Sequence, residues 1–116
     1  MSGFGRSAGV SPPGGVVTHD RDIFTSAGNY SFTTANTVIV KKTVGSSTTV
    51  FLPANPTTGQ EYTVKDGKGD AFTNPITVDG SGINIDGSPS WLLNVNYQSV
   101  TIFFDGSEYL VIGVRS

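Results

Sequence analysis

The sequence predicts an all-β fold, because its apolar residues come in short runs separated by recurring turn residues. Valine, isoleucine, threonine and aromatic residues dominate these runs, and none sustains the 3.6-residue period of a helix. Asp-Gly, the pair that most readily adopts the positive φ angles of a tight turn, occurs four times. We therefore expect a short-stranded antiparallel β-sandwich, or a jelly-roll or barrel-like domain, with an extended N-terminal arm.

Nine short strands are expected. They cover residues 30–32, 37–43, 48–52, 61–65, 76–78, 83–85, 92–95, 99–104 and 109–114.

The clearest strand pair is the hairpin on either side of Asp105-Gly106. Its first strand carries alternating apolar residues that define one face. The second strand can place three apolar residues on the same side, so this hairpin is the firmest element of the predicted fold. The expected inward residues are Val100, Ile102 and Phe104, with Leu110, Ile112 and Val114 facing the same way.

Residues 1–15 differ in composition from the rest of the chain. They are a mixture of Gly, Ser and Pro in which Phe4 and Val10 stand out as large apolar side chains. A segment of this kind is expected to be flexible on its own and to order on a neighbouring subunit. The predicted organisation is an arm of residues 1–15 followed by a single β domain of residues 16–116.

The composition predicts a thin core and a surface that carries hydroxyl groups rather than charge. Of the 116 residues only 36% are hydrophobic, below the roughly 45–50% of an average globular domain. Charged residues make up 14%. A chain of this size has modest intrinsic stability, so a subunit partner could supply the missing burial. We therefore expect a homo-oligomer.

Several partners and compartments are not expected. The net charge is −2 and no basic cluster is longer than Lys41-Lys42, whereas binding to nucleic acid draws on several converging cations. There is no cysteine, and no stretch approaches the roughly 20 apolar residues of a membrane span. The start of the chain lacks the pattern of a secretory signal, so synthesis in the cytosol is expected.

No set of residues forms a recognisable catalytic motif. His19 beside Asp20 could be a base with an orienting carboxylate, but no nucleophile signature accompanies the pair. A glycosidase would need two converging carboxylates, whereas four of the aspartates lie in Asp-Gly turns. The prediction is a non-enzymatic protein; a hydrolase acting on surface polysaccharide is kept as a third alternative.

Two loops contain oxygen ligands at spacings that could hold calcium. Residues 66–70 (DGKGD) lack the later acidic ligands of an EF-hand loop and contain a lysine. Residues 79–86 (DGSGINID) resemble a Gly-rich β-roll repeat loosely and only once. Both are predicted to be hairpin loops, and no cofactor or metal is expected.

Aromatic residues outside the core are candidates for subunit contacts. In an alternating strand, one member of the adjacent pair Phe103 and Phe104 must point away from the core. Aromatic residues are enriched at the centres of protein interfaces. We therefore expect interface residues among Phe4, Val10, Trp91 and Phe103.

From about residue 38 to residue 113 the order of features resembles a β domain found in structural proteins of tailed bacteriophages, in tail fibres and in head-decorating proteins. Each segment describes strands and turns and none describes chemistry. The segments that carry the resemblance are residues 49–53 (TVFLP), 59–66 (GQEYTVKD), 74–78 (NPITV), 83–87 (INIDG), 96–101 (NYQSVT) and 104–109 (FDGSEY).

The resemblance implies a virion component. One such unit without a repetitive stalk favours a capsid decoration, cement or head-fibre protein that binds and stabilises the shell. Its partners would then be the major capsid protein or other virion proteins. The alternative is a tail-fibre, tail-tip or receptor-binding module, for which binding of glycans or of a cell surface would be the distinguishing property.

Overall fold

The computed structural model describes residues 20–116, and this part of the chain contains strands and no helix. It confirms the all-β class. Eight of the predicted runs coincide with strands to within a few residues, and one strand was not expected. The nine strands are β1 (Arg21–Phe24), β2 (Tyr30–Ser31), β3 (Thr37–Val40), β4 (Thr48–Phe51), β5 (Glu61–Asp66), β6 (Ile76–Asp79), β7 (Ser90–Leu93), β8 (Ser99–Phe104) and β9 (Tyr109–Arg115).

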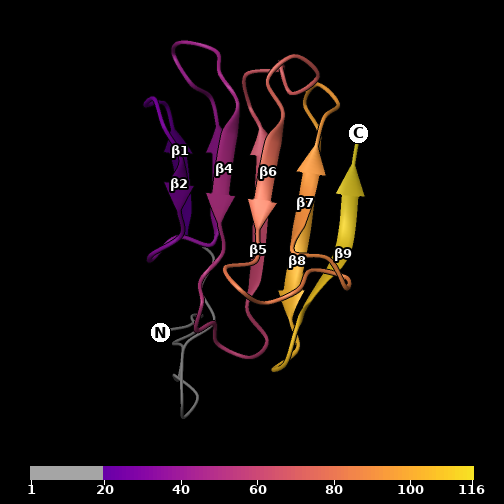
Figure 1. Cartoon of the computed structure of the whole chain (residues 1–116). Helices are drawn as coiled ribbons and strands as arrows, with labels where there is room; N and C mark the ends of the chain where they lie inside the picture. Colours follow the sequence, from indigo (N-terminus) through magenta and orange to yellow (C-terminus); the bar gives the residue numbers. More distant parts are fainter. Residues whose placement is uncertain (1–19) are drawn as a thin grey trace, which may run out of the picture.

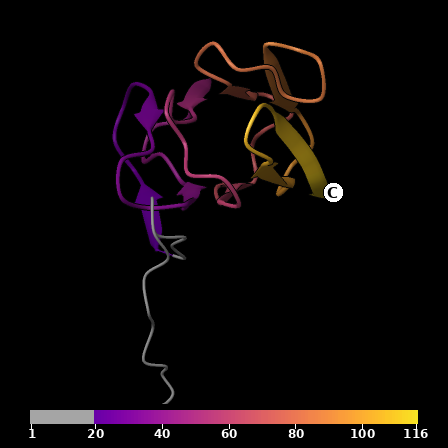
Figure 2. The same cartoon turned by 90° about the horizontal axis from the view of Figure 1, so that it is seen from below.

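Consecutive strands from β1 to β6 alternate between two sheets. The five-stranded sheet has the order β1-β3-β5-β8-β9, and the four-stranded sheet has the order β2-β4-β6-β7. All pairings among the first six strands are parallel, so the chain winds as a coil of three turns with one strand of each sheet per turn (Figures 1 and 2). β7 and the β8–β9 hairpin then add antiparallel strands to the two sheets.

The predicted antiparallel arrangement is therefore wrong for the first two thirds of the domain. Within residues 20–116, four of the seven strand pairings are parallel, whereas a jelly roll consists of antiparallel pairs. Side chains alternate with a period of two in both kinds of strand, so the sequence pattern does not separate them. Parallel neighbours need a long crossover connection. Here that connection is a strand of the opposite sheet.

The core lies between the two sheets, where the inward residues of β3 to β6 and β8 are buried. Six aromatic rings cross it in a row from the first turn of the coil to the last hairpin, and neighbouring ring centroids are 5.1 to 6.2 Å apart. Such contacts add roughly 0.5–1.5 kcal/mol each beyond the burial of area. In order, the rings are Phe24, Tyr30, Phe32, Tyr62, Tyr109 and Phe104.

The hairpin of β8 and β9 is confirmed, but its second strand faces the other way from the prediction. Tyr109 pairs with Phe104 and Val111 with Ile102, so the odd-numbered residues continue the core face. A bulge beside Thr101 then shifts the register. The turn length explains the error, because it decides which residue lies opposite Phe104. Of the three expected inward residues, only Val114 lies opposite a core residue, Val100, while Leu110 and Ile112 take the outer side.

Residues 83–85 do not form the predicted strand. Asp86 and Gly87 adopt φ angles of 48° and 81° and reverse the chain at once, which leaves isolated bridges from Ile85 to Ser88 and to Tyr109. The segment instead closes one side of the domain. Backbone hydrogen bonds join Asp86 and Asn84 to Tyr109 of the five-stranded sheet, and the Ile85 side chain is completely buried.

The other side of the domain begins at β1, which the sequence did not reveal because Arg21 and Asp22 break the apolar alternation. The Tyr30 hydroxyl of β2 donates a hydrogen bond of 3.0 Å to the Asp22 carboxylate and so ties the two sheets together at the first turn. Burial, and next the bond to Asp22 and its charge, raise the pKa of Tyr30 well above its usual range.

The loops gather at two ends of the strands. The upper end, at the top of Figure 1, consists of residues 25–29, 41–47, 67–75 and 94–98. The lower end consists of residues 32–36, 52–60, 80–89 and 105–108. The predicted arm of residues 1–15 lies outside the residues that the structure describes.

Candidate functional site

The upper end is organised around the carboxylate of Asp66, the last residue of β5. This side chain is only 1% exposed. Its two oxygens accept backbone N–H groups from Gly69 at 3.0 Å, Ala71 at 2.9 Å and Tyr97 at 3.0 Å. A buried carboxylate is stable only when such donors satisfy it. Asp66 therefore fastens the loop of residues 67–75 to the loop of residues 94–98.

Further contacts lock the same two loops together. The Phe72 amide donates to the Asn96 side chain at 2.9 Å. The Lys65 ammonium group donates to the Tyr97 carbonyl and lies 5.5 Å from the centroid of the Tyr97 ring. The Gln98 side-chain oxygen accepts two amides of its own loop. The backbone at this end is therefore held by side chains rather than by strand pairing.

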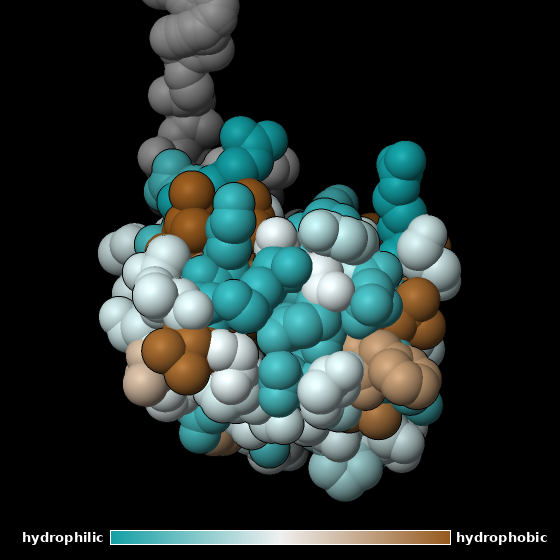
Figure 3. Space-filling model, turned by 90° about the horizontal axis from the view of Figure 1, so that it is seen from above, coloured by the Kyte–Doolittle hydropathy of each residue, from teal (hydrophilic) through white to brown (hydrophobic). Residues whose placement is uncertain are grey.

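This rigid framework presents apolar side chains to solvent. Phe72 is 76% exposed and Tyr97 is 57% exposed, and Tyr97 has the positive φ of 65° that residues with a side chain rarely adopt. Figure 3 looks onto this end and shows hydrophobic patches at its rim around a hydrophilic centre. We call Val44, Phe72, Val95 and Tyr97 the upper apolar surface.

The aspartates of the other three Asp-Gly pairs also stabilise turns of the backbone, each in a different way. Asp86 itself occupies the tight turn, as predicted. The Asp79 carboxylate accepts the Ser81 amide at 2.7 Å. The Asp105 carboxylate accepts the amides of Ser107 and Glu108, and these bonds lower the pKa of Asp105. The prediction that these residues shape turns is thus confirmed, but the turn conformation differs from a tight Asp-Gly hairpin at Asp66, Asp79 and Asp105.

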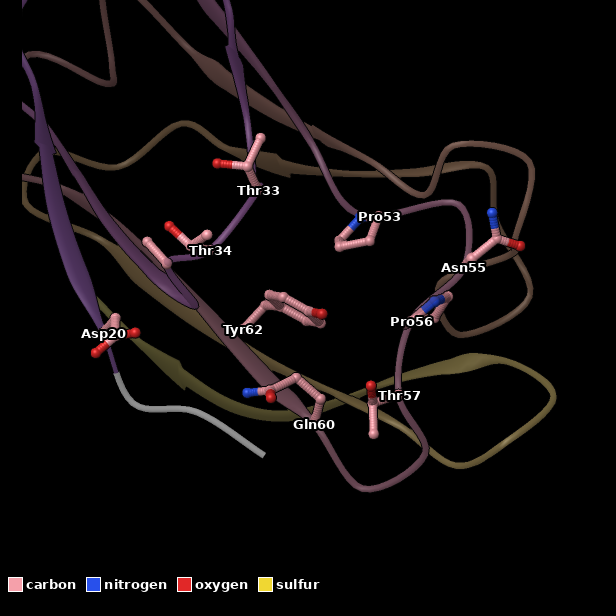
Figure 4. A pocket seen from close by; sticks show the side chains of 10 residues that line it. Asp20, Thr33, Thr34, Pro53, Asn55, Pro56, Thr57, Gln60 and Tyr62 are labelled. Carbon is pink, nitrogen blue, oxygen red and sulfur yellow. The ribbon is translucent and has the colours of Figure 1, made fainter. Parts of the chain in front are cut away.

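The lower end contains a pocket of about 410 Å³ between the loops that follow β2 and β4 (Figure 4). This volume lies in the range of ligand sites. Its lining is mainly polar, with two proline rings among the apolar parts, and of the lining residues in the described chain only Asp20 is charged. The lining residues are Asp20, Thr33, Thr34, Ala35, Pro53, Asn55, Pro56, Thr57, Gln60 and Tyr62.

Tyr62 lies at the floor of this pocket. Its ring belongs to the aromatic row of the core and the residue is only 6% exposed, while Figure 4 shows its hydroxyl pointing into the space beside Pro53 and Pro56. Within residues 20–116 this hydroxyl has no hydrogen-bond partner. The neighbouring Tyr109 differs, because its hydroxyl donates to the Pro53 carbonyl at 2.7 Å. Burial raises the pKa of Tyr62.

The predicted interface residues occupy different places. Phe103 lies half-buried on the outer face of the five-stranded sheet, opposite Leu110 and Glu61, while Phe104 points into the core. Trp91 sits on the inner face of β7 and packs against the core. The interface roles of Phe103 and Trp91 stay predictions. Phe4 and Val10 lie outside the described residues.

Residues 20–116 do not bring together the catalytic or calcium ligands that were weighed in the sequence. His19 lies outside the described part, and Asp20 lines the pocket. No three His, Cys, Asp or Glu side chains come together as metal ligands among the described residues. Asp66 is the first residue of one candidate calcium loop. Both oxygens of its carboxylate already accept hydrogen bonds from backbone amides.

Sequence reasoning missed both the upper apolar surface and the pocket. Phe72 carried a signal, because it is a large apolar residue within a loop of polar and turn-forming residues. The pocket carried none, since its walls come from loops far apart in the sequence.

From residue 20 onward there is no helix of the length and apolar character needed to cross a membrane. No protein-family model matches this chain, and a search of curated proteins finds none that is similar to it.

Proposed function

We propose that the chain is a non-enzymatic structural protein of a tailed-phage virion, a capsid decoration, cement or head-fibre protein that binds and stabilises the shell. The observation that carries the proposal is the upper apolar surface. Asp66 and Lys65 hold the exposed Tyr97 in place before any partner arrives. Asn96 does the same for Phe72 by accepting its backbone amide. A pre-ordered contact surface loses little entropy on binding, and aromatic residues are enriched in the contacts between proteins.

The composition supports the same proposal. A surface poor in charge offers few strongly hydrated groups that would have to be desolvated on contact. The partners would be the major capsid protein or other virion proteins, and the chain would act as a homo-oligomer, with a trimer favoured. Measuring the mass of the free protein in solution tests the trimeric state.

Binding to particles tests the proposal. Particles that lack the protein are mixed with the purified chain, and the bound fraction is measured by co-sedimentation. Phe72→Ser is expected to weaken binding by about 30-fold, the effect of removing one energetically central residue. The control is Leu92→Ser, which removes an exposed apolar residue from the outer face of β7. Equal binding by wild type and Phe72→Ser would contradict the proposed surface.

The arm has its own expected effect. Deletion of residues 1–15 should abolish particle binding and leave the β domain folded, because a flexible segment can wrap a neighbouring surface and order there. Unchanged occupancy of the particles would overturn the cementing role of the arm.

A second candidate function is a tail-fibre, tail-tip or receptor-binding module. The pocket at the lower end favours it, since a polar concave site is suited to recognition rather than cementing. Attachment of the purified chain to host cells, unaffected by Phe72→Ser, would support this second function.

A further inference from the structure

We propose that the pocket at the lower end binds a neutral saccharide, one or two sugar units in size. The inference concerns a different end of the domain from the upper apolar surface, and it holds whether the chain sits on the head or the tail of a virion.

The Tyr62 hydroxyl is open to the pocket. It makes no hydrogen bond within residues 20–116, and it is not among the enclosed side-chain atoms that lack a partner, so the space of the pocket reaches it. It points into the pocket beside Pro53 and Pro56 (Figure 4). A ligand that offers a hydroxyl or ring oxygen at this point would satisfy it.

Polar side chains surround the opening of the pocket. Hydroxyls of Thr33, Thr34 and Thr57 and the carboxamide of Asn55 surround the space, and each both donates and accepts hydrogen bonds. Within the described chain these side chains make no hydrogen bond to one another or to the backbone. Each hydroxyl of a polyol both donates and accepts hydrogen bonds, so a polyol can pair with several groups of this kind at once.

The charge of the lining favours a neutral ligand. Among the described residues the lining contains no lysine, arginine or histidine, and Asp20 is the charged one. A phosphate or an acidic sugar would meet no cation from residues 20–116 and would face a carboxylate, so the proposed ligand is neutral. The rings of Pro53 and Pro56 supply apolar wall for the carbon face of a sugar ring.

Binding of one sugar unit is expected to be weak. About 12 non-hydrogen atoms at modest efficiency correspond to a Kd on the order of 1–10 mM. Methyl glycosides of glucose, galactose, mannose and N-acetylglucosamine are therefore titrated into the full chain labelled with ¹⁵N. With at least one glycoside, the amide signals of residues 33, 34, 55, 57 and 62 should shift together.

Variants test whether the glycoside binds in the pocket or elsewhere on the surface. Tyr62→Phe keeps the ring in the aromatic row and removes only the hydroxyl, so it should weaken binding by about 3- to 10-fold. Asn55→Ala should have an effect of similar size. The control is Thr77→Ala, which removes a hydroxyl from the outer face of β6 and should leave the Kd unchanged. Unaltered amide spectra elsewhere in each variant establish that the fold is intact.

A peptide is the alternative occupant of the pocket, and the same titration distinguishes it from a saccharide. A synthetic peptide of residues 1–15 is titrated in the same way. Shifts of the pocket signals by this peptide and by none of the glycosides would overturn the proposal, as would no shift at about 20 mM of any glycoside, at least twice the expected Kd. Equal affinity of wild type and Tyr62→Phe would also overturn it. None of these results depends on binding to particles.

Discussion

The carboxylate of Asp66 accepts the backbone amide of Tyr97 at 3.0 Å, although 31 residues separate the two in sequence. The same carboxylate holds Gly69 and Ala71, so one buried side chain fixes the end of β5, the following loop and the approach to β8. The exposed aromatic ring of Tyr97 is placed by this bond. The stability of the domain and the shape of its upper surface therefore depend on the same residue.

Asp66→Ala is expected to destabilise the domain by about 3–5 kcal/mol, because three amides lose their acceptor and one of them is fully buried. Asp66→Asn keeps one oxygen but turns a donor toward other donors, and should cost about 2–3 kcal/mol. Chemical unfolding measures both losses. Asp105→Asn, at an exposed turn, is the control and should move the midpoint little; an equal effect at both sites would contradict the anchoring role of Asp66.

Gly69 tests the contact between the two upper loops. It has a φ of +81°, and a Cβ there would lie 2.3 Å from the Tyr97 ring. Gly69→Ala should therefore cost about 2–3 kcal/mol and displace Tyr97, because backbone strain and a steric clash act together. Gly59→Ala is the matched control, since Gly59 has a φ of +91° with nothing within 4 Å of the added methyl.

Gly59→Ala is expected to lower the free energy of unfolding by about 1 kcal/mol, because only the backbone strain acts there and no steric clash. Thermal unfolding of the two variants gives the comparison. Tyr97 fluorescence and the chemical shifts of residues 94–98 should change in Gly69→Ala and stay unchanged in Gly59→Ala. Similar losses in the two variants would show that Tyr97 does not pack on Gly69.

Ile85 closes the side of the domain beside β9, and its side chain is fully buried. Ile85→Ala should destabilise the fold by about 2–5 kcal/mol through lost burial and the cavity that remains. Ile83→Ala removes the same atoms from a partly buried position two residues earlier and should cost less. Urea unfolding distinguishes them, and the opposite order would contradict the role of Ile85 as the closing residue.

Alkaline pH should unfold the domain. Burial raises the pKa of Tyr30, Tyr62 and Tyr109 above the value of about 10 that tyrosine has in an unfolded chain. A raised folded pKa contributes stability that is complete below pH 10 and is lost as the pH rises toward the folded values, because only the unfolded state ionises there. Phenolate absorbance and unfolding midpoints, followed together against pH, should change in step above pH 10. Ionisation of all four tyrosines near pH 10 with the fold retained would contradict the buried positions.

The strands β3 to β6 and β8 and their inward residues were predictable, because alternation with a period of two survives in any sheet. Val38, Val50, Val64 and Val78 carry that alternation and all are buried. The pairing was not predictable from the same pattern, since a strand such as β3 shows the same alternation beside a parallel neighbour as beside an antiparallel one.

The sites were harder to predict than the strands. Asp66-Gly67 has the sequence of a tight turn, yet the Asp66 side chain caps amides of two other loops, a role decided by tertiary contacts. The pocket forms where Tyr62 lies beside the loops that follow β2 and β4. A sequence pattern does not show which distant segments lie side by side. The outward direction of Phe103 was predictable because its neighbour Phe104 had to fill the core.

We propose that the upper apolar surface is the contact surface of a virion structural protein. A cryo-EM reconstruction of the particle that carries this chain would show that contact. We expect density for the domain on the shell, with residues 67–75 and 94–98 against a neighbouring protein and Phe72 buried in the contact. A domain held to the particle with these loops facing solvent, or a particle without this chain, would contradict it.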